Sequence, residues 1–106
     1  MRIIFLVILF LHGLIHLMGF VKAFQLAEIE QLTLPISQSS GLLWLFTCIL
    51  MLSSGVAYLL KTEWWWIITL LAVAISQVLI FMYWQDAKAG TLANLLILIF
   101  IWISRY

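Results

Sequence analysis

Two histidines four residues apart, His12 and His16, are the side chains of this sequence best suited to chemistry. A spacing of four places both rings on one face of a helix, about one turn from each other. The same face carries Gly19 and Ala23, where a second helix can approach closely. Residues 3–21 contain no Asp, Glu, Lys or Arg, so we expect lipid around this helix. Because ionisable groups at membrane depth are costly, both histidines should face other helices or a cavity.

The pair alone predicts neither a metal centre nor a haem. Zinc sites built on two histidines one turn apart need a third ligand, and the predicted spans offer only Cys48 and no acidic residue. Two histidines on one helical face cannot hold opposite sides of one haem, which leaves a single axial ligand or a haem shared between protomers. Ser-His-Asp catalysis is disfavoured because the single aspartate, Asp86, follows the third span. The sequence therefore favours no metal site and no catalytic residue, and it leans away from an enzyme.

The composition indicates an integral membrane protein of one domain, residues 1–106. Of the 106 residues, 67% are hydrophobic and 8% are charged, whereas a soluble domain is roughly half apolar and about a quarter charged. The net charge of +1 and the lack of a Lys/Arg cluster exclude a nucleic-acid partner. A single cysteine excludes an intramolecular disulfide. The apolar N-terminal run resembles a signal peptide, but more apolar runs follow it, so we expect it to be retained.

The apolar runs predict an all-α fold, an integral-membrane four-helix transmembrane bundle with up-down topology. A span needs about 20 helical residues. The predicted spans cover residues 3–24, 41–60, 64–84 and 87–104. Residues 25–40 mix charged and apolar side chains, which is typical of a segment lying at the membrane surface. We expect Ser39 or Ser40 to cap the second span and Asp86 to cap the fourth.

Lysine and arginine predict the orientation. In a four-span protein, both termini and the connection after the second span share one side of the membrane. That side carries Arg2, Lys61 and Arg105, whereas the other carries Lys22 and Lys88. Because positive charge is enriched on cytoplasmic loops, we expect both termini in the cytoplasm. Aromatic residues should form two interfacial belts, with Tyr58, Trp64, Trp65, Trp66, Trp102 and Tyr106 on the cytoplasmic side and Phe24, Trp44, Tyr83 and Trp84 on the other.

Polar residues from several spans fall at a similar depth. Counting about 1.5 Å per residue from the presumed outer ends puts His16, Gln77 and Asn94 in one layer, on the order of 10 Å below the surface. His12 lies one turn deeper, so His16 rather than His12 is expected level with Gln77 and Asn94. The remaining small or polar residues of the spans are expected to serve helix packing: Thr47, Cys48, Ser53, Ser54 and Ser76.

From this layer we predict a polar pocket within the membrane that binds a small amphipathic or redox-active ligand, such as a quinone. The predicted ligand-binding residues are His12, His16, Gln77 and Asn94. His16 would hydrogen-bond the polar head of the ligand, and His12 would relay protons behind it. Gln77 and Asn94 would orient the ligand. The alternative is a non-catalytic accessory subunit, in which these side chains only lock helices together and the apolar exterior binds a larger complex or a second copy of the chain.

Two short motifs resemble the DoxX-like membrane proteins. Residues 19–24, Gly-Phe-Val-Lys-Ala-Phe, are similar to the Gly-x-x-Lys ending of that family's first helix. Residues 86–88, Asp-Ala-Lys, lead to residues 94–98, Asn-Leu-Leu-Ile-Leu, similar to its last helix, in which an Asn opens an apolar stretch. The resemblance implies a four-helix bundle in the bacterial inner membrane and a loose association with quinone or thiol redox systems. It would carry over Lys22 and Asn94 as the shared residues.

Overall fold

The structure, a computed structural model, describes residues 2–30 and 32–105, and these contain helices and no strand. The helices are α1 (Arg2–Ala23), α2 (Gln38–Leu59), α3 (Trp65–Met82), α4 (Trp84–Ala87) and α5 (Gly90–Arg105). The prediction of an all-helical chain is therefore confirmed for the described residues. Two residues used in the orientation argument, Tyr106 and the side chain of Arg105, lie outside the described part.

Helices α1, α2 and α3 are long and apolar enough to cross a membrane. Their lengths are 22, 22 and 18 residues. Helix α5 has 16 residues, which at 1.5 Å per residue gives about 24 Å against a hydrocarbon core of about 30 Å. The three long helices support the prediction of a membrane protein, and the fourth span stays a prediction.

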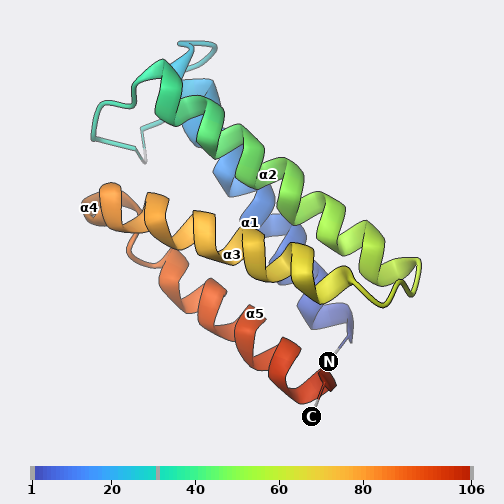
Figure 1. Cartoon of the computed structure of the whole chain (residues 1–106). Helices are drawn as coiled ribbons and strands as arrows, with labels where there is room; N and C mark the ends of the chain where they lie inside the picture. The colour runs from blue at the N-terminus through green and yellow to red at the C-terminus, as the bar shows by residue number, and fades with distance from the viewer. Residues whose placement is uncertain (1, 31, 106) are drawn as a thin grey trace.

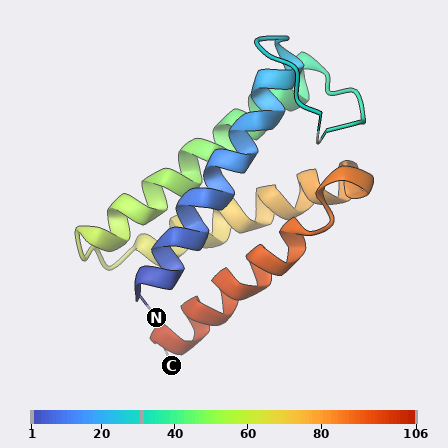
Figure 2. The ribbon, with the colours of Figure 1, turned by 180° about the vertical axis from the view of Figure 1, so that it is seen from behind.

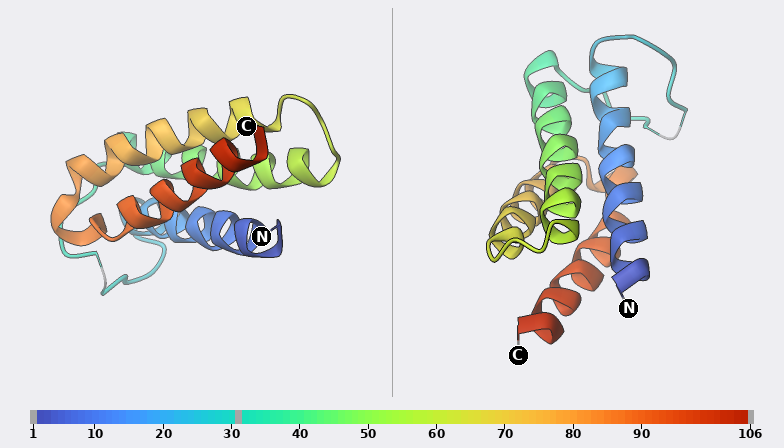
Figure 3. Two further views of the ribbon diagram at one scale, coloured as in Figure 1. Left: turned by 90° about the horizontal axis from the view of Figure 1, so that it is seen from below. Right: turned by 90° about the vertical axis from the view of Figure 1, so that its right-hand side faces the viewer.

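The four longer helices contact one another in a closed sequence. Helix α1 packs along α2, α2 packs against α3, α3 against α5, and α5 against α1. Figures 1 and 2 show the two termini at one end of the molecule, with α4 and the connection between α1 and α2 at the other. The two views of Figure 3 show that this connection bows out to one side of the helices. The four longer helices therefore surround an interior, and each of them turns one face toward it.

Helices α1 and α2 approach closely at two glycines. A Cβ atom added to Gly19 would lie 2.1 Å from the ring of Trp44, and one added to Gly41 would lie 2.2 Å from Cβ of Ala23. The predicted close approach at Gly19 and Ala23 is confirmed. Small residues permit such contact where lipid supplies no hydrophobic contrast between helices. The consequence for the site is that Trp44 lies flat against α1, 5.3 Å from the ring of His16.

Several predictions at the helix ends and in the aromatic belts are wrong. Ser37, not Ser39 or Ser40, caps α2, because its hydroxyl accepts a hydrogen bond from the N–H of Ser40. Asp86 does not cap the fourth span, since it lies inside α4 and α5 begins four residues later. Trp44 and Tyr83 are buried rather than interfacial, with exposed fractions of 2% and 8%.

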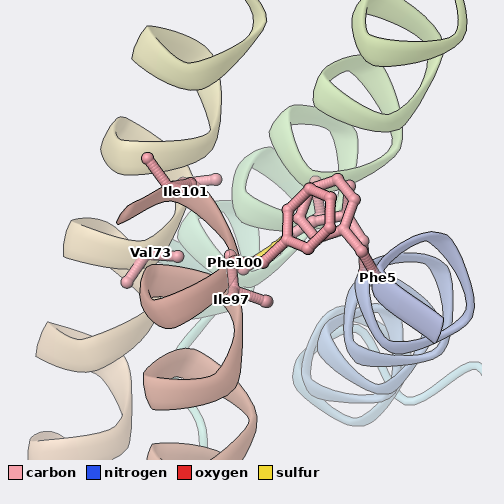
Figure 4. Close-up of a cluster of buried hydrophobic side chains, with 8 residues drawn as sticks. Phe5, Val73, Ile97, Phe100 and Ile101 are labelled. Atoms are coloured by element: carbon pink, nitrogen blue, oxygen red, sulfur yellow. The ribbon is translucent and has the colours of Figure 1, made fainter. Parts of the chain in front are cut away.

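An aromatic cluster fills the interior near the termini. The rings of Phe5 and Phe100 stack with their centroids 4.1 Å apart. Tyr58 and Trp65 meet the Phe5 ring edge-on from α2 and α3. Figure 4 shows how Phe5 faces Phe100 and the aliphatic side chains beside it on α5. The buried hydroxyls near this end, on Ser54 and Thr69, bond carbonyl oxygens of their own helices. The buried polar side chains that bond one another across helices lie further toward the other end.

Replacing Phe100 by alanine should destabilise the packed helices by about 1–3 kcal/mol. The void forfeits van der Waals contacts, whereas lipid adds little transfer free energy, so the cost falls below that of a soluble core. Phe81→Ala is the matched control, because Phe81 is 66% exposed and Phe100 is 6% exposed. Denaturant unfolding in mixed micelles measures both, and equal losses for the two variants would contradict the assigned core.

Candidate functional site

A cavity of about 250 Å³ opens between α1, α2 and the start of α5. Its lining includes His12, His16, Trp44, Leu32, Asp86 and Gly90. The backbone of α5 starts close to α1 here, because a Cβ atom on Gly90 would lie 3.2 Å from Cε1 of His12. The cavity therefore joins both histidines to the end of the molecule where α4 lies.

Behind the cavity, hydrogen bonds join three helices through the two histidines. Nε2 of His12 lies 2.9 Å from Oδ1 of Asn94 on α5. Nε2 of His16 lies 2.9 Å from Oγ of Ser76 on α3. Nδ2 of Asn94 donates to Oγ of Ser76 over 3.2 Å. All four side chains are buried, so each bond replaces one that water would otherwise supply.

The network continues from Asn94 away from the cavity. Nδ2 of Asn94 also donates to Oε1 of Gln77 over 3.0 Å, and Nε2 of Gln77 donates to Oγ1 of Thr91 over 3.1 Å. These three side chains also line a groove between α3 and α5 on the outer surface. We call the connected side chains the polar network: His12, His16, Ser76, Gln77, Thr91 and Asn94.

All four residues predicted for the ligand site lie in the polar network. Asn94 bonds His12, whereas His16 reaches Asn94 only through Ser76. The roles of these residues toward a ligand stay predictions. Both ring nitrogens of His16 have protein partners, because Nδ1 lies 2.7 Å from the carbonyl oxygen of His12.

Ser76, which was expected to serve only helix packing, connects the network. It bonds His16 and Asn94 and lies 3.3 Å from Nε2 of His12. The sequence does contain a signal that Ser76 faces other helices, because Ala72 and Ser76 are four residues apart and form a face of small residues in an otherwise bulky helix. In contrast, the hydroxyl of Thr47 bonds the carbonyl of Leu43 on its own helix, as expected of a packing residue.

The indole of Trp44, whose ring lines the cavity, has a buried and unsatisfied donor. Its side chain is 2% exposed, and its Nε1–H has no hydrogen-bond partner among the described residues. The ring lines the cavity together with His16. A buried donor without an acceptor costs about 1–3 kcal/mol. An acceptor that reached Nε1 would remove this cost.

A short strap, residues 32–34, closes one end of the cavity. Nζ of Lys22 on α1 donates to the carbonyl oxygens of Leu32 and Leu34. The carboxylate of Asp86 on α4 accepts from the N–H groups of Thr33 and Leu34, each over 2.8 Å, and from the Thr33 hydroxyl. Because Leu32 lines the cavity, these two side chains hold a wall of the cavity in place.

The described residues contain no group of three His, Cys, Asp or Glu side chains placed to hold a metal ion. The groups that the site offers to a ligand are hydrogen-bond donors and acceptors and apolar surface. No protein-family model matches the chain, and neither the curated proteins nor the solved structures contain a match.

Acid should release the strap through Asp86. The Thr33 hydroxyl, followed by the N–H groups of Leu34 and Thr33, holds the pKa of the Asp86 carboxyl below its usual value. The carboxylate therefore stabilises the bound strap fully above the ordinary aspartate pKa of about 3.9, and this stabilisation is lost as the pH falls through the lowered pKa. Hydrogen exchange at the Thr33 and Leu34 amides, corrected for its intrinsic pH dependence, should accelerate over that range.

Two variants assign the effect to one carboxyl. Asp86→Asn should exchange faster at neutral pH and lose the acid-dependent step. Glu28→Gln should keep that step, because the described residues show no hydrogen bond from the exposed Glu28 to the strap. Exchange that does not respond to acid in the unmodified protein would contradict the role given to Asp86.

Proposed function

We propose that the chain is a small membrane protein of the bacterial inner membrane, an up-down bundle of four spans with both termini in the cytoplasm. The three long apolar helices and the closed sequence of helix contacts support this proposal. Residues 86–90 would form the interfacial turn of the fourth span, residues 87–104. The resemblance to DoxX-like proteins is part of the same proposal, since Lys22 and Asn94 both hold structural contacts at the site.

The cavity, we propose further, binds a small apolar ring with a polar head, of the kind that quinones represent. The observation that carries this proposal is the buried Nε1–H of Trp44, which has no acceptor among the described residues and belongs to a ring that lines the cavity. An oxygen atom on the ligand would accept this hydrogen bond. The surrounding side chains include Ile15, Met18 and Ile80, which suit an apolar ring.

The size of the cavity limits the ligand to a compact head group. Its volume of about 250 Å³ lies just below the range of roughly 300–1,000 Å³ typical of pockets for drug-sized ligands. A substituted ring fits within this volume, and any long tail would extend between the helices into lipid. The proposed ligand is therefore a compact head group rather than a haem.

Most side chains of the polar network would hold His12 in position and would not contact the ligand themselves. Hydrogen bonds to other protein groups occupy both nitrogens of His16, and the amides of Gln77 and Asn94 bond each other. His12 and Trp44 keep atoms with no hydrogen bond among the described residues. We assign ligand contact to His12 and Trp44, and positioning to His16, Gln77 and Asn94.

The second candidate is a non-catalytic accessory subunit. The observation that favours it is the closure of the polar network, since hydrogen bonds of this kind stabilise membrane helix packing by about 1 kcal/mol each without any ligand. The apolar exterior on all long helices would then contact a larger complex or a second copy of the chain in addition to lipid. Purification with a stoichiometric partner and no ligand binding would favour this candidate.

Binding of duroquinone and durohydroquinone to the protein in lipid nanodiscs tests the ligand proposal. Empty nanodiscs provide the reference for partition into lipid. Trp44→Phe should weaken the better-bound probe about fivefold to tenfold, because it removes one hydrogen bond worth about 1 kcal/mol and keeps the aromatic ring. Trp64→Phe is the matched control, since Trp64 is 53% exposed and does not line this cavity.

Two results would contradict the proposal. One is the absence of any binding above that of empty nanodiscs. The other is equal weakening by Trp44→Phe and Trp64→Phe, which would place the bound probe elsewhere on the protein.

A further inference from the structure

The directions of the hydrogen bonds in the polar network can be assigned one after another, starting from His16. Nδ1 of His16 lies 2.7 Å from the backbone carbonyl oxygen of His12. A carbonyl oxygen can only accept, so Nδ1 of His16 carries a hydrogen. In a neutral imidazole the other nitrogen then has none. Nε2 of His16 is therefore an acceptor.

The next step is the hydroxyl of Ser76, which has one hydrogen to donate. Oγ of Ser76 lies 2.9 Å from Nε2 of His16. Because that nitrogen is an acceptor, the Ser76 hydrogen belongs to it. Ser76 can then only accept from its other neighbours. The atom of Asn94 at 3.2 Å must therefore be the amide nitrogen, as the structure has it.

The orientation of Asn94 fixes the hydrogen on His12. With Nδ2 turned to Ser76, Oδ1 of Asn94 faces Nε2 of His12 at 2.9 Å. An amide oxygen only accepts, so Nε2 of His12 carries a hydrogen. The 3.3 Å approach of this nitrogen to Ser76 is also a donation, because the Ser76 hydrogen is already used. The hydrogen bonds of Gln77 are consistent with this orientation of Asn94, since the Gln77 oxygen accepts from Asn94 and the Gln77 nitrogen donates to Thr91.

Both histidines are neutral in this assignment, for two reasons. The described hydrogen bonds of the network include no carboxylate that would balance a charge. The two rings also lie 4.6 Å apart, so a charge on one would oppose a charge on the other. An uncompensated charge at membrane depth is costly. Nδ1 of His12 is consequently left as a bare acceptor, and no hydrogen bond of the described residues uses it.

We infer that the cavity selects a ring that carries a hydroxyl group, a phenol or a hydroquinone, over the corresponding ring that carries only carbonyl oxygens. The inference rests on the proposed ligand-binding function of this cavity. A hydroxyl is able both to donate to Nδ1 of His12 and to accept from Nε1–H of Trp44, so its chemistry matches both free groups. These are the two polar atoms of the cavity-lining rings that have no partner among the described residues.

A ring with carbonyl oxygens alone satisfies only one of the two groups. Its oxygen accepts from Trp44, but toward His12 it presents a lone pair to a lone pair. A site built to receive a donor discriminates against an analogue that lacks it, because a buried polar atom is then left unpaired. The preference concerns binding alone and requires no electron transfer within the protein.

Two pairs of probes separate the effect of a hydrogen-bond-donating hydroxyl from the effect of ring size. The first pair is durohydroquinone and duroquinone, measured without oxygen so that neither changes its oxidation state. The second is mesitol and methyl mesityl ether, a phenol and its methyl ether, neither of which is a quinone. In nanodiscs, each hydroxyl compound should bind about tenfold more tightly than its partner, after subtraction of partition into empty nanodiscs.

A variant assigns the preference to His12. His12→Phe keeps an aromatic ring and removes Nδ1, so the preference for the hydroxyl compounds should fall to about twofold or less. Thr47→Val is the matched control, because the Thr47 hydroxyl is buried outside the polar network, and this variant should keep the full preference. If His12→Phe does not assemble, the probe pairs on the unmodified protein decide.

The outcomes distinguish this inference from the function on which it rests. Absence of binding by all four probes would contradict the proposed ligand function itself. Binding of duroquinone as tight as that of durohydroquinone, or of the ether as tight as that of mesitol, would overturn the inference and leave the ligand function standing. A preference that survives unchanged in His12→Phe would also overturn it.

Discussion

A polar side chain between membrane helices has no water to bond, so its partners must come from the protein or from a ligand. In this chain the constraint acts most sharply at Ser76, whose single hydroxyl hydrogen goes to His16. That one donation orients the amide of Asn94 and thereby the hydrogen on His12. The interior consequently has a fixed hydrogen-bond direction. The two groups left over, on His12 and Trp44, are the ones that the proposed ligand would use.

The close packing of α1 and α2 also determines one wall of the cavity. The close approach of α1 and α2 at Gly19 presses Trp44 against α1 and removes its indole from the membrane interface. Lys22 and Asp86 then hold the strap from opposite sides, across α1 and α4. A ligand would thus lie between a fixed wall, formed by α1 and α2, and a wall held by two charged side chains. The aromatic cluster around Phe5, whose contact with Phe100 Figure 4 shows, fills the interior near the termini.

The sequence predicted the parts of the fold that depend on local pattern. Long apolar runs identified α1, α2 and α3, and two small residues on one helical face identified where α2 approaches α1. The position of Asp86 was not predictable, because its partners lie more than 50 residues earlier in the chain. Ser76 and Gln77 were equally hard to separate, since adjacent residues differ by about 100° around a helix and the rotation of α3 decides which one faces α1. Helical periodicity shows which residues share a face of a helix, but it does not show which other helix that face contacts.

The hydrogen on each histidine is the most direct test of this account. The chain has only two histidines, His12 and His16, so ¹⁵N labelling of histidine gives a spectrum of four ring nitrogens. For the ligand-free protein in nanodiscs at neutral pH, we expect this spectrum to show two neutral rings in opposite tautomers. His12 should carry its hydrogen on Nε2 and His16 on Nδ1. Two rings in the same tautomer, or one charged ring, would contradict the assigned direction of the network.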